Sequence, residues 1–60
     1  MTHDDFRDAR IKLHLSQLRC AVQLGVSLAT VKNWETGTHR IPKMAAIVMD
    51  QWLEKWEKAR

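Results

Sequence analysis

The segment Gly25–Gly37, GVSLATVKNWETG, is the most informative part of the chain, because two glycines enclose a short helical pattern. Ser27 is a favoured helix N-cap, since its hydroxyl can accept hydrogen bonds from the free amides of the first turn. Gly37 closes the pattern, because the left-handed conformation that follows a last helical turn costs glycine least. Gly25 ends the preceding helical segment in the same way. The sequence therefore predicts a helix over Leu28–Thr36, placed directly after another helix.

The two faces of this helix differ in chemistry. Val31 and Trp34 are three residues apart and share one face, which we expect to point inward. Apolar residues beside a lysine and an asparagine then remain on the outer face, where they suit DNA base edges. A thymine methyl accepts apolar contacts, and adenine pairs with an asparagine amide. The outer residues are Leu28, Ala29, Lys32 and Asn33. An alternative is that Leu28 packs against the last helix as part of the core.

The rest of the chain also has helical periodicity, and no segment alternates between apolar and polar residues as a strand would. Helices are expected over about 4–14, 17–24 and 42–58, with Ser16 as the N-cap of the second and Pro42 opening the last. The predicted fold is all-α, a compact helix-turn-helix bundle of four to five helices. It forms a single domain over residues 1–60, with the helix-turn-helix motif at 16–36.

Composition narrows the class of protein further. The chain has 60 residues and a net charge of +3, and Cys20 is its single cysteine, so an internal disulfide is impossible. Apolar neighbours indicate that Cys20 is a buried helical thiol, which favours a reducing compartment. No apolar run approaches the length of a membrane span, and the N-terminus does not resemble a secretory signal. We therefore expect a cytoplasmic location, in a bacterium or a phage-infected host cell.

Charge is distributed unevenly along the chain. Between Arg19 and Lys43 there are four Lys or Arg residues and His39, but a single acid, Glu35. A basic middle with acidic flanks suits binding to phosphate, although a merely solvated surface is the alternative. The flanking acids are Asp4, Asp5, Asp8, Asp50, Glu54 and Glu57.

The run Leu15–Pro42 resembles the lambda-repressor-like, Cro-type helix-turn-helix family. In such proteins a short glycine-containing turn joins two helices, and the second helix enters the DNA major groove. The residues that carry the resemblance are Ser16, Gln17, Ala21, Gly25, Val26, Ser27, Val31, Trp34, Glu35, Gly37 and Pro42.

The resemblance assigns roles to particular positions. It implies that bases are read by Ser27, Leu28, Ala29, Lys32 and Asn33. It implies that DNA phosphates are contacted by Gln17, Thr36, Arg40 and Lys43. Some members pair an arginine of the first helix with the acid after the aromatic residue, and Arg10 and Glu35 stand at those positions.

The chain departs from the family at the base-reading positions. Many members carry Gln, Arg or Ser where this chain has Leu28 and Ala29, so hydrogen-bond readout falls mainly to Lys32 and Asn33. Methyl contacts and DNA shape would then supply more of the discrimination. Arg19 replaces a common glutamate and adds one more potential phosphate contact.

The function that follows from the resemblance is sequence-specific binding of double-stranded DNA, with the third helix in the major groove. The expected protein is a small transcriptional regulator, a Cro-like repressor of the kind found in phages and other mobile elements, acting on a palindromic operator. The alternative is a protein-interaction module on the same scaffold, since exposed apolar residues also make protein contacts.

A homodimer is expected on DNA, because one short recognition helix makes few base contacts. The last helix carries more apolar surface than one side can bury. We expect it to face the domain with Ala45, Val48 and Trp52 and to form the dimer interface with Met49, Leu53 and Trp56. The alternative is that all of these residues complete a monomer core.

No chemistry beyond binding is indicated. The histidines and Cys20 lack metal-ligand spacing, so no metal site is expected. No nucleophile, base and orienting residue occur together, and an enzyme is the least favoured class. We expect no cofactor, no small-molecule ligand and no membrane contact.

Overall fold

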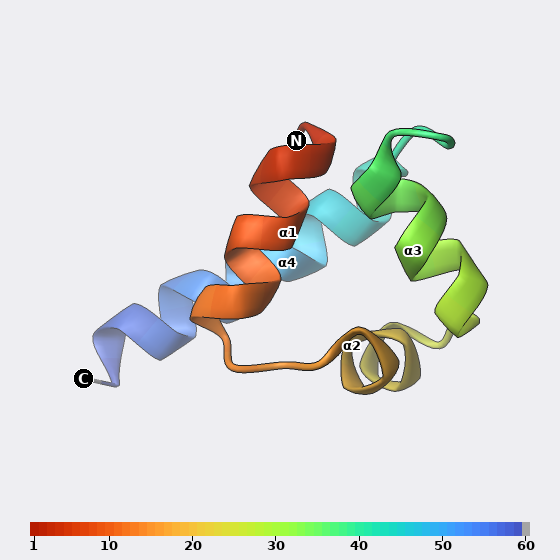
Figure 1. Cartoon of the computed structure of the whole chain (residues 1–60). Coiled ribbons are helices and arrows are strands. Elements are labelled where there is room, and N and C mark those ends of the chain that lie inside the picture. Colours follow the sequence, from red (N-terminus) through yellow and green to blue (C-terminus); the bar gives the residue numbers. More distant parts are fainter. Residues whose placement is uncertain (60) are drawn as a thin grey trace.

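A computed structural model describes residues 1–59, which contain helices and connecting turns but no strand (Figure 1). The predicted all-α class is therefore confirmed. Arg60, the last residue of the predicted domain, lies outside the described residues. Within them, no helix combines the length and the apolar character needed to cross a membrane. The helices are α1 (His3–Lys12), α2 (Gln17–Leu24), α3 (Leu28–Thr36) and α4 (Lys43–Lys58).

Local signals set the bounds of α2 and α3 where the sequence predicts them. The Ser16 hydroxyl accepts a hydrogen bond from the Arg19 amide at 3.0 Å, and the Ser27 hydroxyl accepts one from the Thr30 amide at 3.1 Å. Each serine satisfies an amide that has no partner within its own helix. The two helices therefore begin at defined residues.

Both glycines lie in the left-handed region, as the sequence predicts. Gly25 has φ 72° and ends α2, and Gly37 has φ 81° and ends α3. A Cβ at Gly37 would also lie 3.3 Å from Nδ1 of His3. A larger residue at Gly37 would thus meet both an unfavourable backbone conformation and the imidazole of His3.

The first helix is shifted from its predicted range of about 4–14. It begins at His3, because Thr2 and Asp5 form a capping box with hydrogen bonds of 3.1 and 3.2 Å. The Thr2 amide, which donates to the Asp5 carboxylate, and to a lesser extent the Thr2 side chain lower the pKa of Asp5. The helix ends at Lys12, because the backbone reaches φ 59° at His14, which a right-handed helix cannot accommodate.

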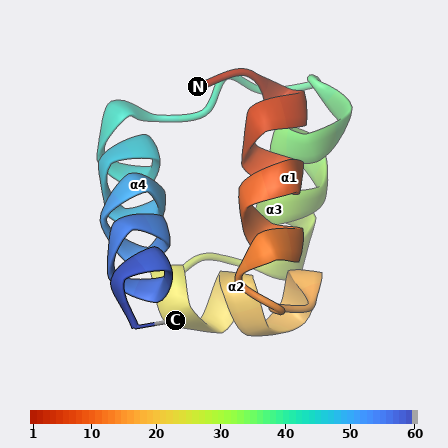
Figure 2. The ribbon, with the colours of Figure 1, turned by 90° about the vertical axis from the view of Figure 1, so that its left-hand side faces the viewer.

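Helices α1 and α3 share the centre of the packing. Helix α1 contacts α3 and α4, and α3 contacts α1 and also α2, which crosses one end (Figure 2). The Phe6 ring meets the Trp34 ring edge to face, with centroids 5.5 Å apart. The buried core consists of Phe6, Ala9, Cys20, Ala21, Val31, Trp34, Ile41, Ala45 and Met49.

Cys20 is fully buried in this core, as the sequence indicates. Burial raises the pKa of its thiol to about 11, because the thiolate would lose its hydration. The thiol therefore stays protonated at neutral pH, and we interpret Cys20 as a packing residue with little reactivity.

One expectation for the last helix is wrong. The sequence predicts that Met49 is exposed and contributes to a dimer interface, but Met49 is fully buried within a single chain. The inward face of α4 is centred on Ala45 and Met49, one turn apart, and not on Val48. Leu53 is partly buried against the core, and the partly buried Trp56 ring lies 5.9 Å from the His14 ring. Packing within the chain, chiefly against α1, therefore buries much of the apolar surface of α4 that the sequence assigns to a dimer interface.

Candidate nucleic-acid interface

Helices α2 and α3 form a compact unit around a tight turn. Ala21 is buried where the helices approach each other, and its carbonyl accepts a hydrogen bond of 3.0 Å from the Val26 amide. Val26 itself packs against the core from the turn. A small residue on α2 and an anchored turn hold α3 in a fixed orientation relative to α2.

The outer face of α3 carries most of the residues that the sequence assigns to base reading. Ala29 and Lys32 are exposed, whereas Asn33 is partly buried. Leu28 is also partly buried, so it is less exposed than predicted, although within residues 1–59 it is not among the side chains that pack against the core. The Ser27 hydroxyl already accepts the N-cap hydrogen bond from the Thr30 amide, and it also lies 2.8 Å from the Thr30 hydroxyl. Lys32 and Ala29 are therefore the most accessible members of this set.

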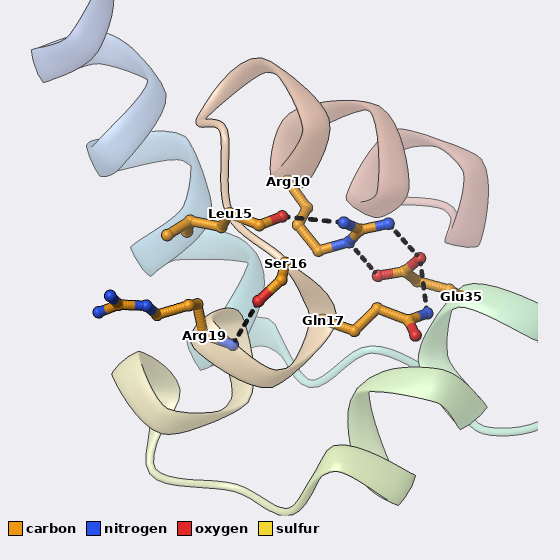
Figure 3. A network of polar contacts seen from close by, with 6 residues as sticks. All are labelled: Arg10, Leu15, Ser16, Gln17, Arg19 and Glu35. Atoms are coloured by element: carbon orange, nitrogen blue, oxygen red, sulfur yellow. Dashed lines mark hydrogen bonds and ion pairs between the residues drawn. The ribbon is translucent and has the colours of Figure 1, made fainter.

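The residues assigned to phosphate contact come from α2, from the end of α3 and from the segment that leads into α4. Gln17 and Arg19 lie in the first turn of α2, Thr36 ends α3, and Arg40 and Lys43 lie in and after the connection to α4. All are exposed except Gln17, which is partly buried. The Arg19 side chain extends in the opposite direction from that of Gln17, so the two do not lie on the same side of α2 (Figure 3).

The segment after α3 is held in place by its own hydrogen bonds. The Asn33 carbonyl accepts from the amides of Thr38 and His39, at 3.0 and 3.2 Å. The Thr36 and Thr38 hydroxyls lie 2.9 Å apart. These bonds order the start of the connection that carries Arg40.

A buried ion pair joins α1 to α3 (Figure 3). Arg10 Nε donates to Glu35 Oε2 at 2.7 Å, and Arg10 Nη2 donates to Oε1 at 3.1 Å. The side chains are only 14% and 5% exposed, respectively. Arg10 Nη1 also donates to the Leu15 carbonyl at 2.9 Å. The bidentate geometry is the strong form of this interaction, and it fixes the carboxylate against α1.

Gln17 extends this network toward the surface. Its Nε2 donates to Glu35 Oε1 at 3.3 Å, so the side chain assigned to DNA phosphate is also bonded to the ion pair (Figure 3). The sequence reasoning missed this bond and the one to Leu15. Spacing along the chain offered no signal for them, because both depend on how α1, α2 and α3 pack together.

The network has an electrostatic consequence. Glu35 is the only acid between Arg19 and Lys43, and its charge is balanced by Arg10. The surface of α2 and α3 is thereby left basic. Other acids gather elsewhere, in a groove of about 440 Å³ whose lining comes from the N-terminus, α1 and α4 and includes Asp5, Asp8 and Asp50. Lys12 lines the same groove, so these acids have a basic residue beside them.

Over 1–59, no three histidine, cysteine or acidic side chains are grouped closely enough to hold a metal ion. The arrangement that remains is a fixed helix pair with a basic surround.

These features define a helix-turn-helix protein, and comparison with known families agrees. The sequence profile of the helix-turn-helix family matches residues 6–48, which is more than half of the chain. The chain belongs to the lambda-repressor-like, Cro-type branch of this family of DNA-binding regulators. The match ends within α4 at Val48. The comparisons with curated proteins and with solved structures gave no match.

Proposed function

We propose that the chain is a small transcriptional regulator, a Cro-like repressor of a phage or another mobile element, which acts in the bacterial cytoplasm. It binds a specific operator by placing α3 in the DNA major groove. One observation carries the proposal: α3 exposes Lys32 and Ala29 on its outer face, while Arg10 holds Glu35 against α1. The face that meets DNA is therefore free of uncompensated negative charge.

Base reading on this face combines two kinds of contact. Asn33 offers an amide that can pair with adenine, and Lys32 can donate to guanine. The methyl of Ala29 and part of Leu28 suit thymine methyl groups. Because hydrogen-bonding residues are few here, sequence-dependent DNA shape supplies part of the specificity.

Contacts to the DNA backbone set the position of α3. Gln17 lies at the N-terminus of α2, where free amides and the helix dipole favour a phosphate. Arg40 and Lys43 hold the strand on the other side of α3. The bond from Gln17 to Glu35 restrains its amide before DNA arrives, so less side-chain entropy is lost on binding.

Two copies act together in this proposal. Helix α3 spans only nine residues, so a single copy contacts few bases. A two-fold pair would read two half-sites about one helical turn apart, which requires a palindromic operator.

Asn33→Ala is expected to weaken binding to the preferred operator by about 1–3 kcal/mol, because one bidentate base contact is lost. The variant should also lose its preference for one particular base pair at a single position of the operator. Selection from a random DNA pool, followed by titration of single-base variants, measures both effects. Gln51→Ala serves as a control, since it also removes a side-chain amide and Gln51 is exposed on α4 with no assigned DNA contact. An unchanged base preference in Asn33→Ala would refute the assignment.

Lys43→Ala is expected to weaken binding to all DNA sequences nearly equally. Each lost phosphate contact lowers the slope of log affinity against log salt by about one unit, because fewer counterions are released. Lys12→Ala, on α1 beside the acidic groove, should leave the slope unchanged. Titrations at several salt concentrations provide the measurement. A flat slope for the native chain would favour the alternative, a protein-interaction module.

A further inference from the structure

A small hollow lies between the connection from α1 to α2, helix α2 and helix α4. Its volume is about 250 Å³, and it is lined by Leu13, Leu15, Gln23 and Trp52. Leu13, Leu15 and Trp52 are partly buried and pack against the core, so they give the hollow an apolar floor. Gln23 is exposed and adds a side-chain amide. The hollow lies just below the range of about 300–1,000 Å³ that is usual for ligand pockets, so it suits a compact ligand.

Arg19 is placed at the edge of this hollow. It precedes Gln23 by four residues, so the two lie on the same side of α2. Figure 3 shows its side chain extending in the same direction as that of Leu15 and away from Gln17. Arg19 is exposed, and within residues 1–59 no acidic side chain pairs with it. A guanidinium without a counterion thus borders an apolar hollow.

The shared DNA-binding motif explains neither Arg19 nor Trp52. Arg19 stands where many relatives have glutamate, and it points away from the side of α2 that carries Gln17. Trp52 lies beyond residue 48, where the match to the family ends. The combination of the two is therefore a feature of this chain in particular.

Charge determines which ligand fits. A guanidinium binds carboxylates strongly, because two parallel N–H groups can donate to both oxygens. The indole of Trp52 favours an aromatic ring as the apolar part of the ligand. A cation is disfavoured, since Arg19 has no acid beside it and the chain has a net charge of +3.

We propose that this hollow binds a small monocarboxylate that carries one aromatic ring. The ring contacts Leu13, Leu15 and Trp52, the carboxylate pairs with Arg19, and the Gln23 amide donates to a carboxylate oxygen. Such a site departs from the sequence-based expectation that the chain has no small-molecule ligand. It does not depend on DNA binding, because its residues lie away from the outer face of α3.

Titration of the isotope-labelled chain with hydrocinnamate, followed by NMR, tests the proposal. Saturable shifts are expected for the amides of Leu13 and Leu15, the side-chain amide of Gln23 and the indole of Trp52. Two control probes each lack one half of the ligand: hydrocinnamyl alcohol has no charge, and acetate has no ring. Each should bind at least about fivefold more weakly than hydrocinnamate, because one class of contact is missing.

Arg19→Gln is expected to reduce the affinity for hydrocinnamate by about fivefold or more, to that of the alcohol, because the charged donor is lost. Arg40→Gln is the matched control, since it removes an exposed arginine after α3 and should bind hydrocinnamate like the native chain. Both positions are exposed, so both variants should fold, and their NMR spectra verify this.

Several results would overturn the proposal. Equal affinities for hydrocinnamate and its alcohol, or an unchanged affinity in Arg19→Gln, would show that Arg19 does not select a carboxylate. Shifts centred on other residues, or no saturable shift at millimolar concentrations, would show that the hollow is not the site. Shifts of the same resonances that grow with protein concentration alone would show that a second copy of the chain covers the hollow instead.

Discussion

Glu35→Gln is expected to destabilise the domain by about 3–5 kcal/mol, the usual cost of removing one partner from a buried ion pair. The substitution keeps the shape of the side chain but removes its charge. The Arg10 side chain is only 14% exposed, so its guanidinium would be left largely buried without a counterion. Gln17 would also lose a charged acceptor. Small domains have a total stability of only about 5–15 kcal/mol, so unfolding should become readily detectable.

The chain contains a matched control for this experiment. Glu54 and Lys58 form an ion pair on α4, with Oε1 and Nζ 3.1 Å apart, but both side chains are more than 60% exposed. Glu54→Gln should therefore cost less than about 1 kcal/mol. Urea denaturation of the three proteins gives the comparison. If Glu35→Gln unfolds at the same urea concentration as Glu54→Gln, the buried pair has no special role in stability.

Met49→Ala is expected to cost about 2–5 kcal/mol, because it opens a cavity in the core. Met49 is fully buried between helices, whereas Met44, on the same helix, is 72% exposed. Met44→Ala should change the free energy of unfolding by no more than about 0.5 kcal/mol in the monomer. The same chemical change is therefore expected to have a large effect at one position of α4 and almost none at the other.

Thermal and urea unfolding at low protein concentration measure this difference without a contribution from self-association. Equal effects of the two substitutions would contradict the packing of α4 described above. A large effect of Met49→Ala that disappears on dilution would instead restore Met49 to an interface between copies.

Much of the fold follows from short segments of sequence. The bounds of α2 and α3 depend on Ser16, Gly25, Ser27 and Gly37, which act within one helical turn and need no distant partner. The bounds of the first helix were predicted less accurately. Its end depends on the positive φ of His14, and a histidine does not by itself indicate that conformation.

The candidate site was predictable in part. Periodicity placed Ala29 and Lys32 on the outer face of α3, and both are exposed in the structure. The pairing of Arg10 with Glu35 was implied by family resemblance and not by spacing, since 25 residues separate the two. The bond between Gln17 and that pair escaped prediction altogether, because it needs three helices in place.

Helix α4 separates local from tertiary information most clearly. Its length follows from its sequence, because Pro42 can open a helix and no glycine or proline interrupts the residues behind it. Its apolar residues cover more than one face, so periodicity alone could not say whether Met44 or Met49 points inward. Contact with α1 selects the Met49 face, because only that face meets a surface able to bury it.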